Sequence, residues 1–531
     1  MSGYVNREQH SSSGVRGPAW FALATVLAIG VAIAALLYAP FATRPMDVLD
    51  FPNFVPLLRD NPTFLTRLTA LVHYYEDQGR LNIIPYFFIV AKWSLFGMHM
   101  ALWQTTRFIQ MWLIVIGAYV VLRDLRVSRF GAVSGSALFV VAPAAMIGWE
   151  RLTIAEPLGT LLLLLATHLA ARYQADERWR LRALSIVVAL LAIAFTKEML
   201  LVVVPFVLAV ACSLSPDGRF EPMRATRRNS YLVALAGAVL LLAAVGIAWV
   251  ALHAKADALA GQYGKAAISI EQVLAPFLLF SVPGYSLAFP GLPVLLLLAD
   301  LGFVVILALG WGLTLTRAAD ISEALRRLGI PLLLLLPGAL IYIPWKNLQS
   351  SYGLPFLLAP ALLLGYALTA LEKYRVRGLV PIQALTIVAL AACGISAHRY
   401  GSQYLALQRV NADVAARIAG SSDQDSTLFT VTSWSRLARV GPGPTMGRYV
   451  LATTGRALAT PVRDILCGQL DTALRAGSNL LIVSYDFRCG SLSRPDWSIR
   501  RYFPYLDLST LRLGVDSVRA DLLLYRRGSK P

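Results

Sequence analysis

Charge is scarce in this chain. Asp, Glu, Lys and Arg make up 15% of its 531 residues, against about 25% in soluble globular proteins. Acidic residues are the rarer kind, with 30 Asp and Glu against 48 Lys and Arg, so the formal net charge is +18. Hydrophobic residues account for 57% of the chain. This composition argues against an ordinary soluble protein and favours one embedded in lipid.

Cysteine is also rare, with four in the chain. Cys212 and Cys393 lie in or beside apolar stretches, where a free cysteine fills the core as a small apolar side chain. Cys467 and Cys489 lie in the polar C-terminal region, where they can pair in a disulfide if that region is outside the cytoplasm. The chain also lacks an internal repeat, a nucleotide-binding glycine loop and a basic soluble module, so its net charge does not indicate a nucleic-acid partner.

Long apolar stretches are what the chain has instead. Residues 21–37, 185–195, 231–250 and 356–371 are apolar enough to sit in lipid. No small-residue cleavage site follows the stretch at 19–38, so we interpret it as a retained membrane span and not as a signal peptide. The sequence therefore predicts a polytopic α-helical membrane protein.

Basic residues predict the orientation of the spans, because loops rich in Lys and Arg face the cytoplasm. Basic connections alternate along the chain with basic-poor ones, and we assign the poor set to the outer side. The basic connections are residues 123–129, 172–182, 219–228, 317–327 and 373–377. The poor connections are residues 149–153, 196–198, 253–271 and 346–353.

Eleven spans agree with this alternation and leave residues 1–18 as a cytoplasmic tail. They are roughly 19–38, 104–122, 131–148, 155–172, 183–196, 199–214, 231–252, 291–316, 329–345, 353–371 and 379–397. The apolar segments 83–96 and 274–289 have about 15 residues each, whereas a span needs roughly 20, so we predict that they re-enter the membrane or lie on its outer face. Residues 19–398 thus form a transmembrane domain of about 11–13 helices.

Residues 399–531 differ in character, with 18 Arg and Lys, 10 Asp and no Glu. Apolar runs rich in β-formers at 426–433, 479–485 and 521–525 predict strands. Helical patterns at 405–419 and 461–476 lie between or before these runs. We therefore predict a small soluble α/β domain on the periplasmic or extracellular side of the membrane.

A long acidic loop follows the first predicted span. It covers residues 40–82, far more than the usual connection of about 4–6 residues. Among its five carboxylates, Asp47 and Asp50 are three residues apart and would share one face of a helical turn. The loop also contains His73, Glu76 and Asp77. The alternative to a functional site is a set of solvated acids that cap a short helix.

Three more polar elements lie on the same predicted side of the membrane. Glu156 follows Arg151 at the start of an apolar helix, Lys197 lies between two apolar runs, and Lys346 and Tyr352 belong to a polar stretch before a late span. Ionisable residues at membrane depth are costly, and this favours a functional role. The alternatives are a helix N-terminal charge for Glu156 and an ion pair of Lys197 with its neighbour Glu198.

A carboxylate base, a second carboxylate and a lysine are what sugar transfer from a lipid phosphate requires. The base deprotonates the acceptor hydroxyl. Cations, or a divalent metal ion held by carboxylates, stabilise the leaving phosphate. Because such a donor is itself a lipid, its binding site is expected at the membrane.

The order of these motifs resembles the GT-C glycosyltransferase superfamily, near its aminoarabinose, dolichyl-phosphate-mannose and arabinofuranosyl transferases. The resemblance rests on the acidic first loop, the stretch from Arg151 to Pro157, the Thr196-Lys197 turn, and the stretch from Tyr352 to Pro355. It implies an enzyme of the cytoplasmic (inner) membrane that moves a hexose or pentose on the outer face. The donor would be a polyprenyl-phosphate sugar, and the acceptor a glycan, lipid or protein of the cell envelope.

The resemblance also implies roles for residues. The catalytic aspartate falls on Asp50 or Asp47, the second acid on Glu156 with Arg151 beside it, and the phosphate contact on Lys197. The sequence departs from the family in three places. The spacing Asp-x-x-Asp replaces Asp-Glu or Glu-x-Asp in the first loop, and Ile84-Pro85-Tyr86 replaces a Pro-Pro-Leu before the second helix. Ser351 stands where the family often has Arg, with Lys346 as a possible substitute. The further predicted contacts are His73, Glu76, Asp77, Tyr352 and Lys346.

Two other functions stay open on the sequence. A transporter or flippase of lipid-linked sugars would show inverted repeats or charges within spans. We find no repeat, and Asp300 is the clearest charge inside a span. A non-catalytic envelope assembly protein, in which the C-terminal domain does the binding, would leave the acidic loop without a role.

Overall fold

The computed structural model describes residues 51–77, 79–80, 82–217, 219–223, 225–253, 293–317, 321–343, 350–374 and 379–420, and the backbone of the strands that follow. The predicted span at 19–38, the segment at 274–289 and both C-terminal cysteines lie outside the described residues. Cys212 and Cys393 are buried and free, as predicted for core positions.

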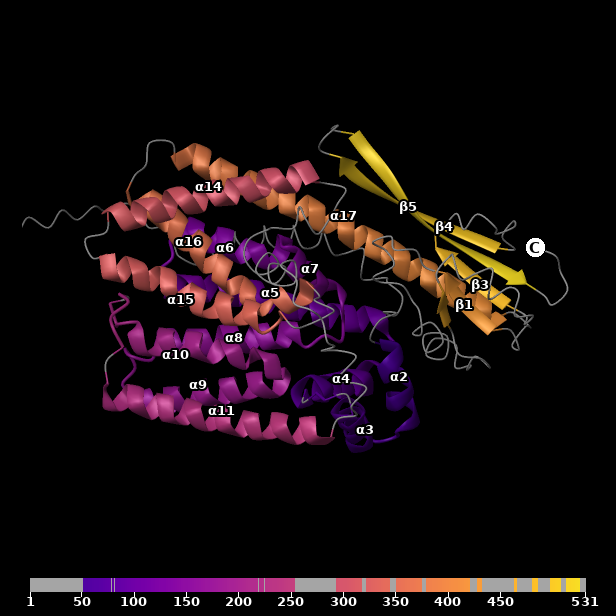
Figure 1. Ribbon diagram of the computed structural model, residues 1–531, viewed down its shortest axis with the longest axis horizontal. Coiled ribbons are helices and arrows are strands. Elements are labelled where there is room, and N and C mark those ends of the chain that lie inside the picture. Colours follow the sequence, from indigo (N-terminus) through magenta and orange to yellow (C-terminus); the bar gives the residue numbers. More distant parts are fainter. Residues whose placement is uncertain are drawn as a thin grey trace, which may run out of the picture.

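Helices running side by side form the body of the molecule (Figure 1). Three short 3₁₀ segments lie in the connections between these helices: η2 (Glu198–Val203), η4 (Ser350–Gly353) and η5 (Pro355–Leu357). The helices of this bundle are α5 (Met100–Asp124), α6 (Arg129–Val141), α7 (Pro143–Glu150), α8 (Glu156–Ala171), α9 (Trp179–Thr196), α10 (Val204–Ser213), α11 (Arg227–His253), α14 (Pro293–Arg317), α15 (Ile321–Leu340), α16 (Leu358–Lys373) and α17 (Leu379–Gly420).

Several of these helices are suited to a membrane. Within the described residues, five helical segments are long and apolar enough for a crossing: α5, α9, α11, residues Ala299–Arg317 of α14, and Pro355–Lys373. Large apolar side chains such as Leu252 and Val388 are exposed on the bundle, as expected where lipid replaces water. These features support a multi-pass membrane protein, while the predicted total of eleven spans stays a prediction.

Two predicted boundaries were wrong. The span predicted at 131–148 is two helices, because Pro143 lacks a backbone N–H and disfavours helical geometry at the residue before it. Ala142 accordingly has an extended backbone, with φ −69° and ψ 139°. The span predicted at 379–397 and the helix predicted at 405–419 are one 42-residue helix, α17. No proline follows Pro381 within this helix to interrupt it.

Close packing of α6 on α16 depends on glycine. A Cβ atom at Gly131 would lie 2.7 Å from the carbonyl oxygen of Gly365, and one at Gly135 would lie 2.8 Å from that of Ala361. Real Cβ atoms do not approach backbone oxygens so closely, so the two backbones meet because these positions lack side chains. Small residues let membrane helices associate in this way.

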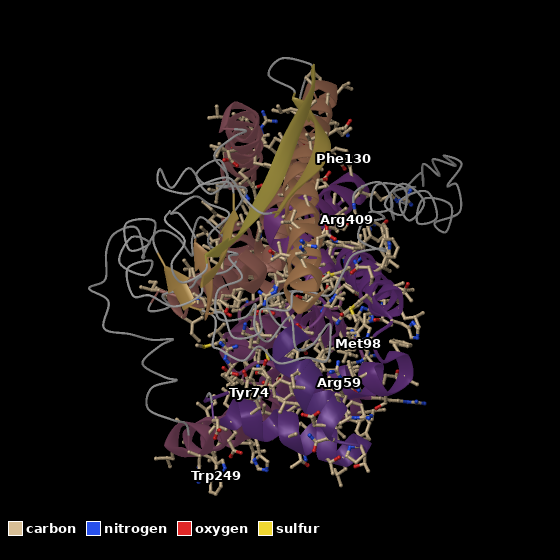
Figure 2. All side chains as sticks on the ribbon, turned by 90° about the vertical axis from the view of Figure 1, so that its right-hand side faces the viewer. Arg59, Tyr74, Met98, Phe130, Trp249 and Arg409 are labelled. Carbon is tan, nitrogen blue, oxygen red and sulfur yellow. The ribbon has the colours of Figure 1, made fainter. Side chains whose placement is uncertain are left out.

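Three short helices lie together at one end of the bundle (Figure 1): α2 (Phe51–Asp60), α3 (Phe64–Glu76) and α4 (Ile83–Phe96). Figure 2 views the molecule from this end and labels Arg59 of α2 and Tyr74 of α3. Thr63 and Thr66 form a reciprocal capping box at the start of α3. The 14 residues of α4 are fewer than the roughly 20 of a full span, in line with the predicted re-entrant or interfacial helix.

Beyond the bundle, the strands β1 (Thr427–Val431), β2 (Arg463–Ile465), β3 (Leu480–Tyr485), β4 (Trp497–Asp507) and β5 (Arg512–Tyr525) pair in the order β2-β1-β3-β5-β4. The first three strands are parallel, and β5 is antiparallel to both β3 and β4. The helix predicted at 461–476 is wrong over β2, and β4 was not predicted. The far part of α17 packs against β4 and β5. The predicted soluble α/β domain as a whole stays a prediction.

Candidate active site

A buried ion pair joins the ends of two neighbouring helices. Lys197 follows the last residue of α9 with an extended backbone, and Glu156 is the first residue of α8. The Nζ atom of Lys197 lies 2.5 Å from Oε1 of Glu156. The two residues are 4% and 3% exposed. Lys197 thus pairs with a residue distant in sequence, and the alternative pair with Glu198 is not formed.

Tyr352 covers this ion pair. The Nζ atom of Lys197 lies 3.9 Å from the centre of the Tyr352 ring, within the range of a cation–π contact. The ring of Tyr342 stacks on Tyr352, with centroids 5.1 Å apart and planes inclined by 12°. The lysine ammonium therefore lies between a carboxylate and an aromatic face that a second tyrosine supports.

Arg151 is a second cation near Glu156. Arg151 is 8% exposed, and its positive charge attracts the Glu156 carboxylate. Side chains of helix α5 bind the backbone before and after Arg151. Gln104 donates from Nε2 to the carbonyl oxygen of Trp149 at 3.1 Å, and Arg107 donates to that of Ile154 at 3.3 Å. The start of α8 is thereby fixed, and with it the position of Glu156.

The end of the first loop attaches to the turn that carries Lys197. With its side-chain amide oriented to donate, Asn82 bonds the carbonyl oxygen of Thr196 at 3.2 Å and Oε2 of Glu198 at 3.1 Å. The preceding Arg80 is partly exposed. Burial lowers the pKa of its guanidinium, but the surrounding groups, Glu198 and three tyrosines among them, outweigh burial and raise that pKa above its usual value.

Sequence reasoning did not select Arg80, Asn82 or Tyr342 as site residues. Arg80 and Asn82 lie between His73 and Tyr86, a polar stretch from which only His73, Glu76 and Asp77 were predicted as contacts. Their position depends on how the loop folds back onto η2. Tyr342 lies just past the end of α15, and nothing in the local sequence shows that it stacks on Tyr352.

The other predicted contacts of the first loop lie apart from the ion pair. His73 Nδ1 is 3.3 Å from Oε2 of Glu76, and the two side chains are 72% and 26% exposed. Asp77 caps the end of α3 and is exposed. None of the three contacts Glu156 or Lys197, and their role as substrate contacts stays a prediction. Asp47, Asp50 and Lys346 lie outside the described residues.

The described residues do not show a metal centre. Across them, no three side chains of His, Cys, Asp or Glu come together as a metal ion would require. Glu156 has Lys197 as its ion-pair partner and Arg151 in its field, a cationic setting that does not fit a metal ligand.

Comparison with known proteins shows the fold. No protein-family model matches the chain, and no curated protein matches its sequence. Among solved structures, the chain is similar to ArnT from Cupriavidus metallidurans bound to undecaprenyl phosphate. That likeness has a TM-score of 0.50 and 13% identity, and it covers 94% of this chain and 98% of that one.

Two further structures are similar to a lesser degree. Archaeoglobus fulgidus oligosaccharyltransferase has a TM-score of 0.48 and 11% identity, covering 84% of this chain and 65% of that one. The mycobacterial arabinofuranosyltransferase AftD has a TM-score of 0.47 and 15% identity, covering 93% of this chain and 41% of that one. All three structures are GT-C glycosyltransferases. The likeness to ArnT confirms the predicted resemblance at the level of the fold: the chain has a GT-C fold.

Proposed function

We propose that this protein is a membrane glycosyltransferase that moves a sugar from a polyprenyl-phosphate donor to an acceptor of the cell envelope. The observation that carries the proposal is the buried Glu156–Lys197 pair under Tyr352, in a chain with a GT-C fold. The similar ArnT was solved with undecaprenyl phosphate bound, so a fold of this kind accommodates a lipid phosphate. The sugar is a hexose or pentose, and the acceptor is a glycan, lipid or protein.

The proposed reaction is a displacement at the anomeric carbon of the donor sugar. A first-loop aspartate, Asp50 or Asp47, takes the proton of the acceptor hydroxyl. The acceptor oxygen then forms a bond to the anomeric carbon, while the bond from that carbon to the phosphate oxygen breaks. The polyprenyl phosphate leaves with the electron pair of that bond. Its developing negative charge is stabilised by the remaining N–H donors of the Lys197 ammonium.

Glu156 and Arg151 have a supporting role in this proposal. The Glu156 carboxylate accepts one hydrogen bond from Lys197 and thereby fixes the direction of the ammonium. Arg151 lies in the field of the same carboxylate. Because α5 holds the backbone on either side of Arg151, the charged groups are positioned before a substrate arrives. Such preorganisation is the main source of electrostatic catalysis.

Transfer in vesicles tests the function. The purified protein is reconstituted with a polyprenyl-phosphate sugar, and release of polyprenyl phosphate and labelling of an envelope extract are measured. We expect Asp50→Asn to reduce transfer by about 10²-fold or more if Asp50 is the base. Asp60→Asn serves as the matched control, since Asp60 is an exposed acid of the same loop.

The same vesicles separate the alternatives. Full transfer by Asp50→Asn, Asp47→Asn and the double variant would contradict the proposed base. Movement of the sugar lipid between leaflets without any product would identify a flippase. Analysis of envelope glycans and glycolipids in a deletion strain would identify the transferred sugar, because that group would be missing.

A further inference from the structure

Two arginine-rich helix starts lie together at the end of the bundle opposite the Glu156–Lys197 pair. Helix α9 begins at Trp179 and ends one residue before Lys197. At about 1.5 Å per residue, its 18 residues extend roughly 27 Å. Helix α11 begins at Arg227 and runs beside α9 (Figure 1). The rings of Trp179 and Tyr231 meet edge to face with centroids 5.6 Å apart, so the two helices start side by side.

Two guanidinium groups, one from each helix, lie against Trp179. The Cζ atom of Arg180 is 5.3 Å from the centre of the Trp179 ring, and that of Arg228 is 5.7 Å from it. Both distances are within the range of a cation–π contact. Arg228 also donates to the carbonyl oxygen of Gln174 at 3.3 Å. Trp179 therefore brings positive charges of α9 and α11 together.

Carboxylates do not neutralise the exposed arginines at this end. Neither helix has an acidic residue in its first turn, although the helix dipole favours a carboxylate there. Asp176, which precedes α9, is bound by Arg182 at 2.5 Å, and its neighbour Glu177 is exposed. Arg180 and Arg227 are both exposed, and neither forms an ion pair with a carboxylate in the part of the chain that the structure describes. An anion that reaches this end therefore meets guanidinium donors that it can bind.

Exposed apolar side chains continue from the arginines along both helices. On α9 they are Leu181, Leu184 and Val188, which share one helical face. On α11 they include Val233 and Leu241. Both helices are long and apolar enough to cross a membrane, so these side chains are suited to contact the acyl chains of lipids. The arginines next to them lie where the headgroups of the same lipids are expected.

We propose that the starts of α9 and α11 bind the phosphate of an anionic membrane phospholipid through Arg180, Arg227 and Arg228, with its acyl chains along the exposed apolar side chains of the two helices. Guanidinium groups suit this ligand because they offer paired N–H donors to phosphate oxygens. A zwitterionic phospholipid carries a cation beside its phosphate and is therefore bound more weakly. Binding here is independent of the proposed sugar transfer, because Lys197 lies at the other end of α9.

Competition between two lipids with identical acyl chains tests the site. The purified protein in detergent is mixed with equal amounts of dioleoyl phosphatidylglycerol and dioleoyl phosphatidylcholine, and native mass spectrometry measures which lipid stays bound. We expect the intact protein to retain phosphatidylglycerol at least about tenfold better. Arg180→Gln/Arg227→Gln should reduce this preference to about twofold or less, since each arginine near a headgroup contributes about fivefold. Arg180→Lys/Arg227→Lys keeps the charges but not the paired donors and should retain part of the preference.

Arg126→Gln/Arg129→Gln is the matched control, because it removes two exposed arginines from another basic connection on the same predicted side. It should keep the lipid preference of the intact protein. Equal losses in the two glutamine double variants would overturn the proposal, because they would show a general attraction to anionic lipid and not a site. The same holds if the intact protein has no preference, or if Arg180→Gln/Arg227→Gln keeps all of it.

Folding of each variant is checked in phosphatidylcholine by size-exclusion chromatography and thermal unfolding. If Arg180→Gln/Arg227→Gln does not fold, the single variants Arg180→Gln and Arg227→Gln decide. A loss of about fivefold in either one supports the site. An unchanged preference in both overturns it.

Discussion

The Nζ atom of Lys197 lies 3.9 Å from the centre of the Tyr352 ring and 2.5 Å from Oε1 of Glu156. The ring of Tyr342 stacks on that of Tyr352. Tyr352 thus contacts both the cation and a second aromatic ring, and these contacts hold it against the lysine.

The buried pair should show strong coupling in stability. Glu156→Gln leaves the Lys197 ammonium without its carboxylate, and Lys197→Met leaves the carboxylate without its ammonium. Each single change is expected to cost about 3–5 kcal/mol, because an unpaired charge stays buried. The double variant should cost clearly less than the sum of the two. Thermal unfolding in detergent, followed by size-exclusion chromatography, gives the three values. Strict additivity would contradict a direct pair.

Asn82 should tolerate alanine better than aspartate. Asn82→Ala removes two hydrogen bonds, to Thr196 and Glu198, at a cost of about 1–3 kcal/mol. Asn82→Asp removes the donor as well and places a carboxylate against the Glu198 carboxylate and a carbonyl oxygen. We therefore expect lower stability and slower sugar transfer for Asp than for Ala. Equal effects of the two changes would mean that Asn82 does not face these oxygens.

Glycine is required where α6 meets α16. Gly131→Ala places a methyl group 2.7 Å from the carbonyl oxygen of Gly365 and should destabilise the protein by about 1–3 kcal/mol. Gly237→Ala in α11 is the matched control, since no atom lies within 4 Å of the added methyl group. There alanine should be neutral or stabilise by about 0.5–1 kcal/mol. Thermal unfolding of both variants compares them, and a harmless Gly131→Ala would contradict the close contact.

The sequence placed several site residues on one side of the membrane but did not predict their contacts. The alternation of basic loops placed Glu156, Lys197 and Tyr352 on one side of the membrane, and the structure brings all three into contact. The partner of Lys197 could not be predicted, because it depends on the extended backbone of that residue at the end of α9. Arg80 reaches the site only because the loop folds back onto η2, which is a tertiary effect.

For the strands and helices, too, some features could be predicted from the local sequence and others could not. The apolar runs correctly predicted β1, β3 and part of β5; the first two are rich in β-branched or aromatic residues, and the run at 521–525 is a short stretch of Leu ending in Tyr. Strand β4 was missed because its sequence contains two arginines and a proline, which do not form a regular apolar pattern. The predicted span at 379–397 and the predicted helix at 405–419 form one helix, α17, because the more polar residues between them continue the helix; the change in polarity marks the end of the apolar stretch and not the end of the helix.

Helix α17 is a continuous rod between the bundle and the sheet. At about 1.5 Å per residue, its 42 residues extend roughly 63 Å, about twice the thickness of the hydrocarbon core of a bilayer. One part packs against α14 and α6, and the far part packs against β4 and β5. Because α17 is one uninterrupted helix, a change in its tilt at one end also moves the other end. A tilt of α17 by a few degrees within the bundle would therefore swing the sheet sideways by several ångströms, with the membrane as the pivot.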